Sequence, residues 1–146
     1  MNVSLVPVPN IDAIWPHLRE GFHRSVMKTG GDIETGDLWV QCRNGSAFLI
    51  IAHDTEIRAA SIWRPDTWQT GRVLRCLALY GEGMEDWIGE MKALATRLAL
   101  DCGATALVSE GRAGWQKVFP KATVLRMLYR EPIQEARPMS AEGEWR

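Results

Sequence analysis

The stretch from Met84 to Leu98 constrains the fold of this chain more than any other feature. Its apolar residues recur at steps of three and four, and acidic or polar residues fill the positions between them. That spacing matches the helical period of about 3.6 residues and predicts a long helix with one face against a core. The apolar positions are Met84, Trp87, Ile88, Met91, Leu94, Ala95 and Leu98.

Three strand-like runs precede this helix directly. Residues 47–52 are continuously apolar and are bounded by turn residues, which is typical of a buried strand. Residues 57–63 and 73–80 are the next two runs, and the segment 64–71 between them is rich in turn formers. The chain therefore predicts a three-strand meander followed at once by a covering helix.

The remaining elements complete a mixed α/β order. Residues 3–8 suit a short edge strand, and a helix with one apolar face follows from Asp12 and ends at the glycines 30–31. A second, short helix spans 35–43. After the long helix we predict a strand at 105–109, a two-turn helix at 115–119 and a last strand at 124–129. The order β-α-α-β-β-β-α-β-α-β predicts an α/β fold, a mixed sheet flanked by helices.

Composition narrows the classes of partner and location. The 146 residues suit one domain, and 17 basic against 18 acidic side chains leave a net charge of −1, which excludes strong attraction to nucleic acid or anionic lipid. The three cysteines form no CxxC pair and the histidines no cluster, so neither a metal site nor a disulfide framework is predicted. The longest apolar run is too short to cross a membrane, and the first ten residues lack signal-peptide features, which favours a cytosolic protein.

The element order resembles the GNAT superfamily of acetyl-CoA-dependent N-acyltransferases, over residues 1–131, with 132–146 as a C-terminal tail. Trp15-Pro16 and the segments 75–81 and 109–115 resemble, more narrowly, small GNAT-like proteins of phages and prophages. Some of those proteins are virion or morphogenesis proteins rather than enzymes. The resemblance therefore implies a GNAT-like fold with two possible kinds of role.

In GNAT enzymes a Q/R-x-x-G-x-G/A loop before the long helix holds the coenzyme A pyrophosphate, because free amides at a helix start bind anions. This chain keeps two glycines there, but no Gln or Arg precedes them. Three carboxylates, those of Glu82, Glu85 and Asp86, occupy the loop and repel an anion. If coenzyme A binds, the resemblance implies that it lies against Leu77, Ala78, Leu79, Gly81 and Gly83. Arg72, Arg75 and Arg112 are the candidates for supplying the missing positive charge.

The resemblance assigns no catalytic residue. Many family members use a Tyr in the short helix after the fifth strand, whereas this chain has Trp115 and Phe119 there. A general base would have to be a carboxylate or a histidine in the cleft. His53, Glu56 and Glu110 lie near predicted strand ends and are the candidates; solvated turn residues are the alternative.

The seven tryptophans suggest a second kind of site. Trp15, Trp39, Trp87 and Trp115 fall at apolar helix positions and belong to the core. Trp63 and Trp68 bracket a polar loop, and Trp145 lies in the tail. Trp and Arg are enriched at binding hot spots, so an exposed loop is one interpretation and a hairpin folded over the sheet edge is the other. The candidate partner-binding residues are Trp63, Arg64, Trp68, Arg72 and Trp145.

Two hypotheses follow. The first is a phage-type GNAT-like protein with a degenerate coenzyme A site and no cofactor, which binds another protein or a virion component, alone or as an oligomer, in the host cytoplasm or the virion. The second is a divergent N-acyltransferase that binds acetyl-CoA and transfers the acyl group to an amine.

Overall fold

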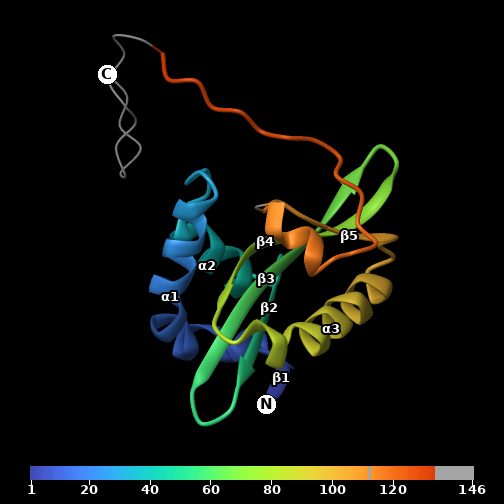
Figure 1. Ribbon diagram of the computed structural model, residues 1–146. Helices are drawn as coiled ribbons and strands as arrows, with labels where there is room; N and C mark the ends of the chain where they lie inside the picture. Colours follow the sequence, from blue (N-terminus) through green and yellow to red (C-terminus); the bar gives the residue numbers. More distant parts are fainter. Residues whose placement is uncertain (112, 134–146) are drawn as a thin grey trace.

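The computed structural model describes residues 1–111 and 113–133. Within them a single five-stranded sheet carries helices on both faces (Figure 1). The strands are β1 (Asn2–Leu5), β2 (Phe48–His53), β3 (Ile57–Trp68), β4 (Gly71–Gly81) and β5 (Ala106–Ser109). The helices are α1 (Ile11–Lys28), α2 (Thr35–Arg43) and α3 (Ile88–Asp101), with 3-10 turns η1 (Val8–Asn10), η2 (Met84–Asp86) and η3 (Ala113–Lys117).

The strands lie in chain order, β1-β2-β3-β4-β5. The first four pair antiparallel: short turns join β2 to β3 and β3 to β4, while α1 and α2 lie between β1 and β2 in the chain. Helix α3 carries the chain back so that β5 pairs parallel to β4. The predicted α/β sheet flanked by helices is therefore confirmed. None of the helices within the described part of the chain is long and apolar enough to cross a membrane.

Each face of the sheet has its own core. Helices α1 and α2 cover one face, where Leu18, Phe22 and Leu38 are fully buried. Helix α3 covers the other, where Trp87 and Met91 lie against Leu74 in the same cluster. The predicted long helix is thus confirmed, although its first turn is the separate 3-10 turn η2.

Two late elements differ from the prediction. The two-turn helix at 115–119 is the 3-10 turn η3, and the predicted strand at 124–129 is no strand. Residues 124–129 have no sheet partner among the described residues, and the segment leaves the body of the domain and crosses toward α1 (Figure 1). An apolar run with strand propensity forms a strand only where a neighbouring edge receives it. The division at residue 131 stays a prediction.

The hairpin of β3 and β4 is longer than predicted. The expected turn-rich loop at 64–71 is regular strand up to Trp68, paired Arg64↔Arg75 through Trp68↔Gly71, with the turn confined to Gln69 and Thr70. Because β2 pairs with β3 only as far as Trp63, and β5 pairs with β4 only from Val73 onward, the last two pairs, Thr67↔Arg72 and Trp68↔Gly71, form a two-stranded ribbon. Turn-forming residues thus occupy strand positions at the outer end of the hairpin.

Gly81, the last residue of β4, provides a test of how closely β4 packs against β3 and Trp87. A Cβ placed there would lie 2.5 Å from the Ala59 Cβ and 2.8 Å from Trp87 Cζ2. We expect Gly81→Ala to lower the free energy of unfolding by about 1–3 kcal/mol, because overpacking displaces the strand or the indole. Chemical denaturation monitored by tryptophan fluorescence measures the change.

Gly89 is the matched control, since a Cβ there meets nothing within 4 Å in α3. Gly89→Ala should stabilise the protein by about 0.4–1 kcal/mol through the unfolded chain. Equal effects of the two substitutions would contradict the close contact between β4, β3 and η2.

Candidate functional site

The most distinctive site is the cleft that opens where β4 and β5 part. The two strands pair from Val73↔Ala106 to Cys76↔Ser109, and there β5 ends. β4 continues to Gly81, so that Leu77–Gly81 have no neighbour on the β5 side among the described strands. The sheet is therefore open beside the second half of β4.

A β-bulge lies at the start of this free edge. Ile62 pairs with Ala78 and Trp63 with Cys76, which leaves Leu77 as the extra residue. The bulge reverses the alternation: Cys76 and Leu79 both pack on the α3 side, while Ala78 lies on the α1 side. The alternation of side chains between the two faces of β4 is therefore interrupted between Leu77 and Ala78.

Backbone groups of β4 point into the opening. Ser25 Oγ on α1 donates a hydrogen bond of 2.7 Å to the Leu79 carbonyl, which therefore points away from β3. In an antiparallel ladder the N–H and C=O of one residue point to the same side, and residues two apart share that side. The N–H groups of Leu79 and Gly81 consequently face the cleft as well.

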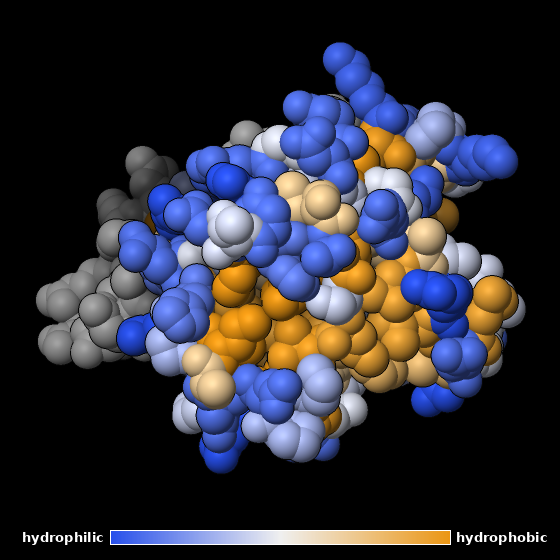
Figure 2. Space-filling view, turned by 90° about the horizontal axis from the view of Figure 1, so that it is seen from below, coloured by the Kyte–Doolittle hydropathy of each residue, from blue (hydrophilic) through white to orange (hydrophobic). Residues whose placement is uncertain are grey.

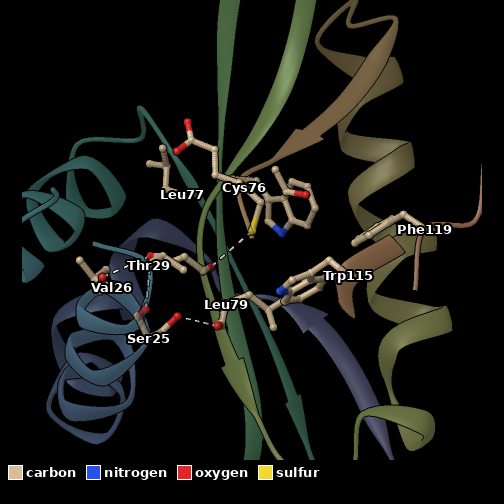
Figure 3. Close-up of a pocket in the computed structure, with 12 residues that line it drawn as sticks. Ser25, Val26, Thr29, Cys76, Leu77, Leu79, Trp115 and Phe119 are labelled. Atoms are coloured by element: carbon tan, nitrogen blue, oxygen red, sulfur yellow. Dashed lines mark hydrogen bonds between the residues drawn. The ribbon is translucent and has the colours of Figure 1, made fainter. Parts of the chain in front are cut away.

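A cavity of about 60 Å³ lies at the bulge, between α1 on one side and η3 on the other (Figure 3). A water molecule needs about 10–15 Å³ of such space, so the cavity has room for a group of a few heavy atoms. Its lining residues are Ser25, Val26, Thr29, Trp63, Cys76, Leu77, Ala78, Leu79, Ser109, Glu110, Trp115 and Phe119. Leu77, Ala78 and Leu79, predicted as coenzyme-binding residues, thus lie together on its wall.

The lining offers no ready acid, base or nucleophile. Burial raises the pKa of the Cys76 thiol to about 12, which keeps it protonated and unreactive at neutral pH. The Glu110 carboxylate accepts a 2.6 Å hydrogen bond from Arg75. Thr29 Oγ1 donates to the Val26 carbonyl at 3.2 Å. Any reaction in this cavity therefore depends mainly on positioning.

The other candidate acids and bases lie outside the cavity. His53 Nε2 and Ser4 Oγ share a hydrogen bond of 3.2 Å, and Glu56 lies 3.8 Å from Arg58 Nη1. Tyr80 packs edge-on against Phe22, with ring centroids 5.0 Å apart, and burial raises its pKa. Of the three base candidates only Glu110 lines the cavity.

The loop that contains Gly81 and Gly83 has one feature that favours the binding of an anion and one that opposes it. Gly83 has a left-handed backbone (φ +63°), and the amides of Gly83, Met84 and Glu85 donate to no described backbone or side-chain acceptor. Yet Glu82, Glu85 and Asp86 are all exposed and form no ion pair with a described residue. At this loop the free amides attract an anion, whereas the carboxylates repel it.

The arginines do not supply the missing charge. Arg75 is bound to Glu110, and six residues of strand place it about 20 Å from Gly81. Arg72 Nη1 donates a 2.9 Å hydrogen bond to the Cys102 carbonyl at the end of α3. Both predictions are wrong because these side chains lie at the opposite end of β4; Arg112 lies outside the described residues.

Of the two interpretations of the segment with Trp63 and Trp68, the exposed loop is wrong. Trp63 is 2% exposed, and its indole N–H donates to Ser61 Oγ at 2.8 Å in the core. Arg64 is bound to Asp66 at 2.7 Å and to Gln41 at 3.0 Å, and Trp68 is half-buried at the end of the ribbon. The arrangement matches the alternative of a hairpin that packs its tryptophans inward; Trp145 lies outside the described residues.

Sequence reasoning missed the contribution of α1. Ser25 and Thr29 lie one turn apart and bring hydroxyl groups to the cavity (Figure 3). In the sequence, the only indication of this contribution is that polar residues lie beside the apolar helix face that ends at Val26. Cys76 was missed because nothing in the sequence indicates that β5 ends beside it, and this end leaves its side chain at the cavity.

A second, open groove of about 450 Å³ lies between β1 and the beginning of α1. This end of the molecule shows a broad apolar area rimmed by charged side chains (Figure 2). Asn10 and His17 contribute the larger polar side chains of its lining, and no carboxylate or arginine joins them. Among the described residues that line this groove, His17 has the only titratable side chain.

Known structures share this architecture. A predicted acetyltransferase from Clostridium acetobutylicum, solved with acetyl-CoA, matches 91% of this chain and 95% of its own with a TM-score of 0.64 at 14% identity. A GCN5-related N-acetyltransferase from Ralstonia eutropha JMP134 matches 90% and 97%, with a TM-score of 0.60 at 14% identity. An aminoglycoside acetyltransferase from an uncultured soil metagenomic sample, in complex with sisomicin, matches 91% and 96% with a TM-score of 0.64 at 7% identity. The chain has the GNAT fold. No family model and no curated protein matches its sequence.

The burial of the thiols is directly testable. Burial raises the pKa of both Cys42 and Cys76 to about 12, so their thiolate fractions stay very small until the pH approaches that value. We expect iodoacetamide at pH 8 to alkylate both at least a hundredfold more slowly in the folded protein than in denaturant. Peptide mass spectrometry measures each rate. Alkylation of Cys76 at its unfolded rate would contradict the closed wall of the cavity.

Proposed function

We propose that this chain is a divergent acyl-CoA-dependent N-acyltransferase that binds the acyl thioester in the cleft between β4 and β5. The observation that carries the proposal is the free edge Leu77–Gly81, opened by the end of β5 and by the bulge at Leu77. The likeness to acetyltransferase structures supports it, including one solved with acetyl-CoA.

The pantetheine arm fits this edge by ordinary strand chemistry. Its two amide groups can hydrogen bond to outward backbone groups of β4 as a neighbouring strand would. Ser25 already occupies the Leu79 carbonyl, which leaves the Leu79 and Gly81 N–H groups as donors. The acyl end then reaches the cavity at Cys76–Leu79, which accommodates a small acyl group.

Acyl transfer at this site relies on proximity. The neutral acceptor amine attacks the thioester carbonyl, and a C–N bond forms as the C–S bond breaks. The coenzyme A thiolate leaves; the amine proton passes to water, and water returns a proton to the thiolate. Because Cys76 is protonated and Glu110 is bound to Arg75, no covalent acyl-enzyme step is invoked. Correct positioning alone contributes a large part of the rate enhancement of such a reaction.

A binding or assembly role without coenzyme, of the virion-associated kind that the phage-like motifs suggest, is the second candidate. The specific observation in its favour is the trio Glu82, Glu85 and Asp86, which lie without ion-pair partners where coenzyme phosphates would lie. It requires that acetyl-CoA does not bind at physiological concentrations.

Titration calorimetry with acetyl-CoA separates the two candidates. The acyltransferase proposal predicts a Kd tighter than about 100 μM, or roughly −5.5 kcal/mol. No detectable heat at millimolar acetyl-CoA would sink the proposal and favour the binding role. Acetyl-pantetheine, which lacks the pyrophosphate, serves as the matched ligand and should bind with at least comparable affinity if the loop repels phosphate.

The acidic loop generates its own prediction. Neutralising it with Glu85→Gln and Asp86→Asn should tighten acetyl-CoA binding by about five- to thirtyfold, because each of the two removed charges contributes roughly 0.5–1 kcal/mol of repulsion at these distances in water. Binding of acetyl-pantetheine should not change. Glu20→Gln, an exposed carboxylate on α1, is the control for net charge. A tightening with Glu20→Gln of the same size would mean that the effect is not local.

A further inference from the structure

The wall that α1 contributes to the cavity presents two hydroxyl groups whose protons are already bound. Ser25 Oγ donates to the Leu79 carbonyl at 2.7 Å, and Thr29 Oγ1 donates to the Val26 carbonyl at 3.2 Å. A hydroxyl has one proton and two lone pairs, so each oxygen can still accept a hydrogen bond. Both residues line the cavity from the same side (Figure 3). This wall therefore suits a group that donates hydrogen bonds.

The spacing of two side chains one helical turn apart suits a nitrogen with two N–H groups. Residues four apart in a helix have Cβ atoms about 5–6 Å apart. Two hydrogen bonds of about 2.9 Å that leave one nitrogen at a near-tetrahedral angle end on oxygens about 4.7 Å apart. A neutral primary amine has two N–H groups and one lone pair. When both N–H groups bind this wall, the lone pair and the carbon substituent point away from α1.

The rest of the cavity suits this arrangement. Its volume of about 60 Å³ holds about four to six water-sized groups at 10–15 Å³ each, enough for an acetyl group and the attacking nitrogen. Across from α1, the rings of Trp115 and Phe119 stack with centroids 5.7 Å apart and offer an apolar surface to the carbon substituent (Figure 3). Glu110, the one carboxylate of the described lining, is bound to Arg75 and is not free to hold the amine as an ammonium ion.

We infer that Ser25 and Thr29 bind the two N–H groups of the acceptor and so direct the lone pair of a neutral, unhindered primary amine at the thioester carbonyl. The inference rests on the proposed function, which places the thioester along β4. A secondary amine has one N–H group and leaves one of the two oxygens without a partner. The two hydroxyl groups therefore select primary over secondary amines.

Acetyl transfer from acetyl-CoA to benzylamine and to N-methylbenzylamine, followed by the release of free thiol, tests the pair. The wild-type chain should favour benzylamine in kcat/KM by at least about threefold, because the N-methyl group removes one hydrogen bond. Thr29→Val keeps the shape of the side chain without the hydroxyl. It should lower kcat/KM for benzylamine by about three- to tenfold and leave that for N-methylbenzylamine unchanged. Ser25→Ala should have the same selective effect, and Thr29→Ser, which keeps the hydroxyl, should retain the preference.

Thr96→Val is the matched control. Thr96 Oγ1 donates to the Lys92 carbonyl in α3 at 2.8 Å, as Thr29 does in α1, but Thr96 does not line the cavity, so both rates should stay unchanged. A chain that binds acetyl-CoA but acetylates neither amine, acetylates both equally, or keeps its preference in Thr29→Val would overturn the inference alone. A chain that does not bind acetyl-CoA would overturn the proposed function, and this inference with it.

Discussion

The four-residue pairing between β4 and β5 determines what this molecule can do. It joins the strands from Val73 to Cys76 and stops at Ser109, while β4 continues to Gly81. With the bulge at Leu77, this leaves outward backbone groups and a small cavity between α1 and η3. A longer β5 would pair with Leu77–Gly81 and close the cleft.

Two electrostatic requirements conflict at the end of β4. Carboxylates at Glu82, Glu85 and Asp86 suit the beginning of α3, because they complement the positive end of its dipole. The same charges oppose a phosphate group. The free amides of Gly83 and Met84 therefore offer an anion site that its own side chains weaken, and the cleft must depend more on the pantetheine and acyl portions of a ligand.

Most of the architecture was predictable because it rests on periodicity. The helix at Met84–Leu98, the meander and the parallel return strand are all indicated by the spacing of apolar residues, which recur at steps of three and four in a helix and of two in a strand. The bulge at Leu77 and the use of Ser25 were not predictable, because they depend on strand register and on a helix far away in the sequence. The inward position of Trp63 was one of the two alternatives that the sequence left open. The segment 124–129 has strand composition without a strand partner, which composition alone cannot reveal.

Backbone amide shifts during titration with acetyl-CoA test the central claim most directly, because they locate the ligand as well as detect it. The account predicts that the largest shifts fall on Leu77, Leu79 and Gly81, with a smaller change at Ser25, whose hydroxyl binds the Leu79 carbonyl. Shifts confined to the groove between β1 and α1, or none at all along β4, would contradict it.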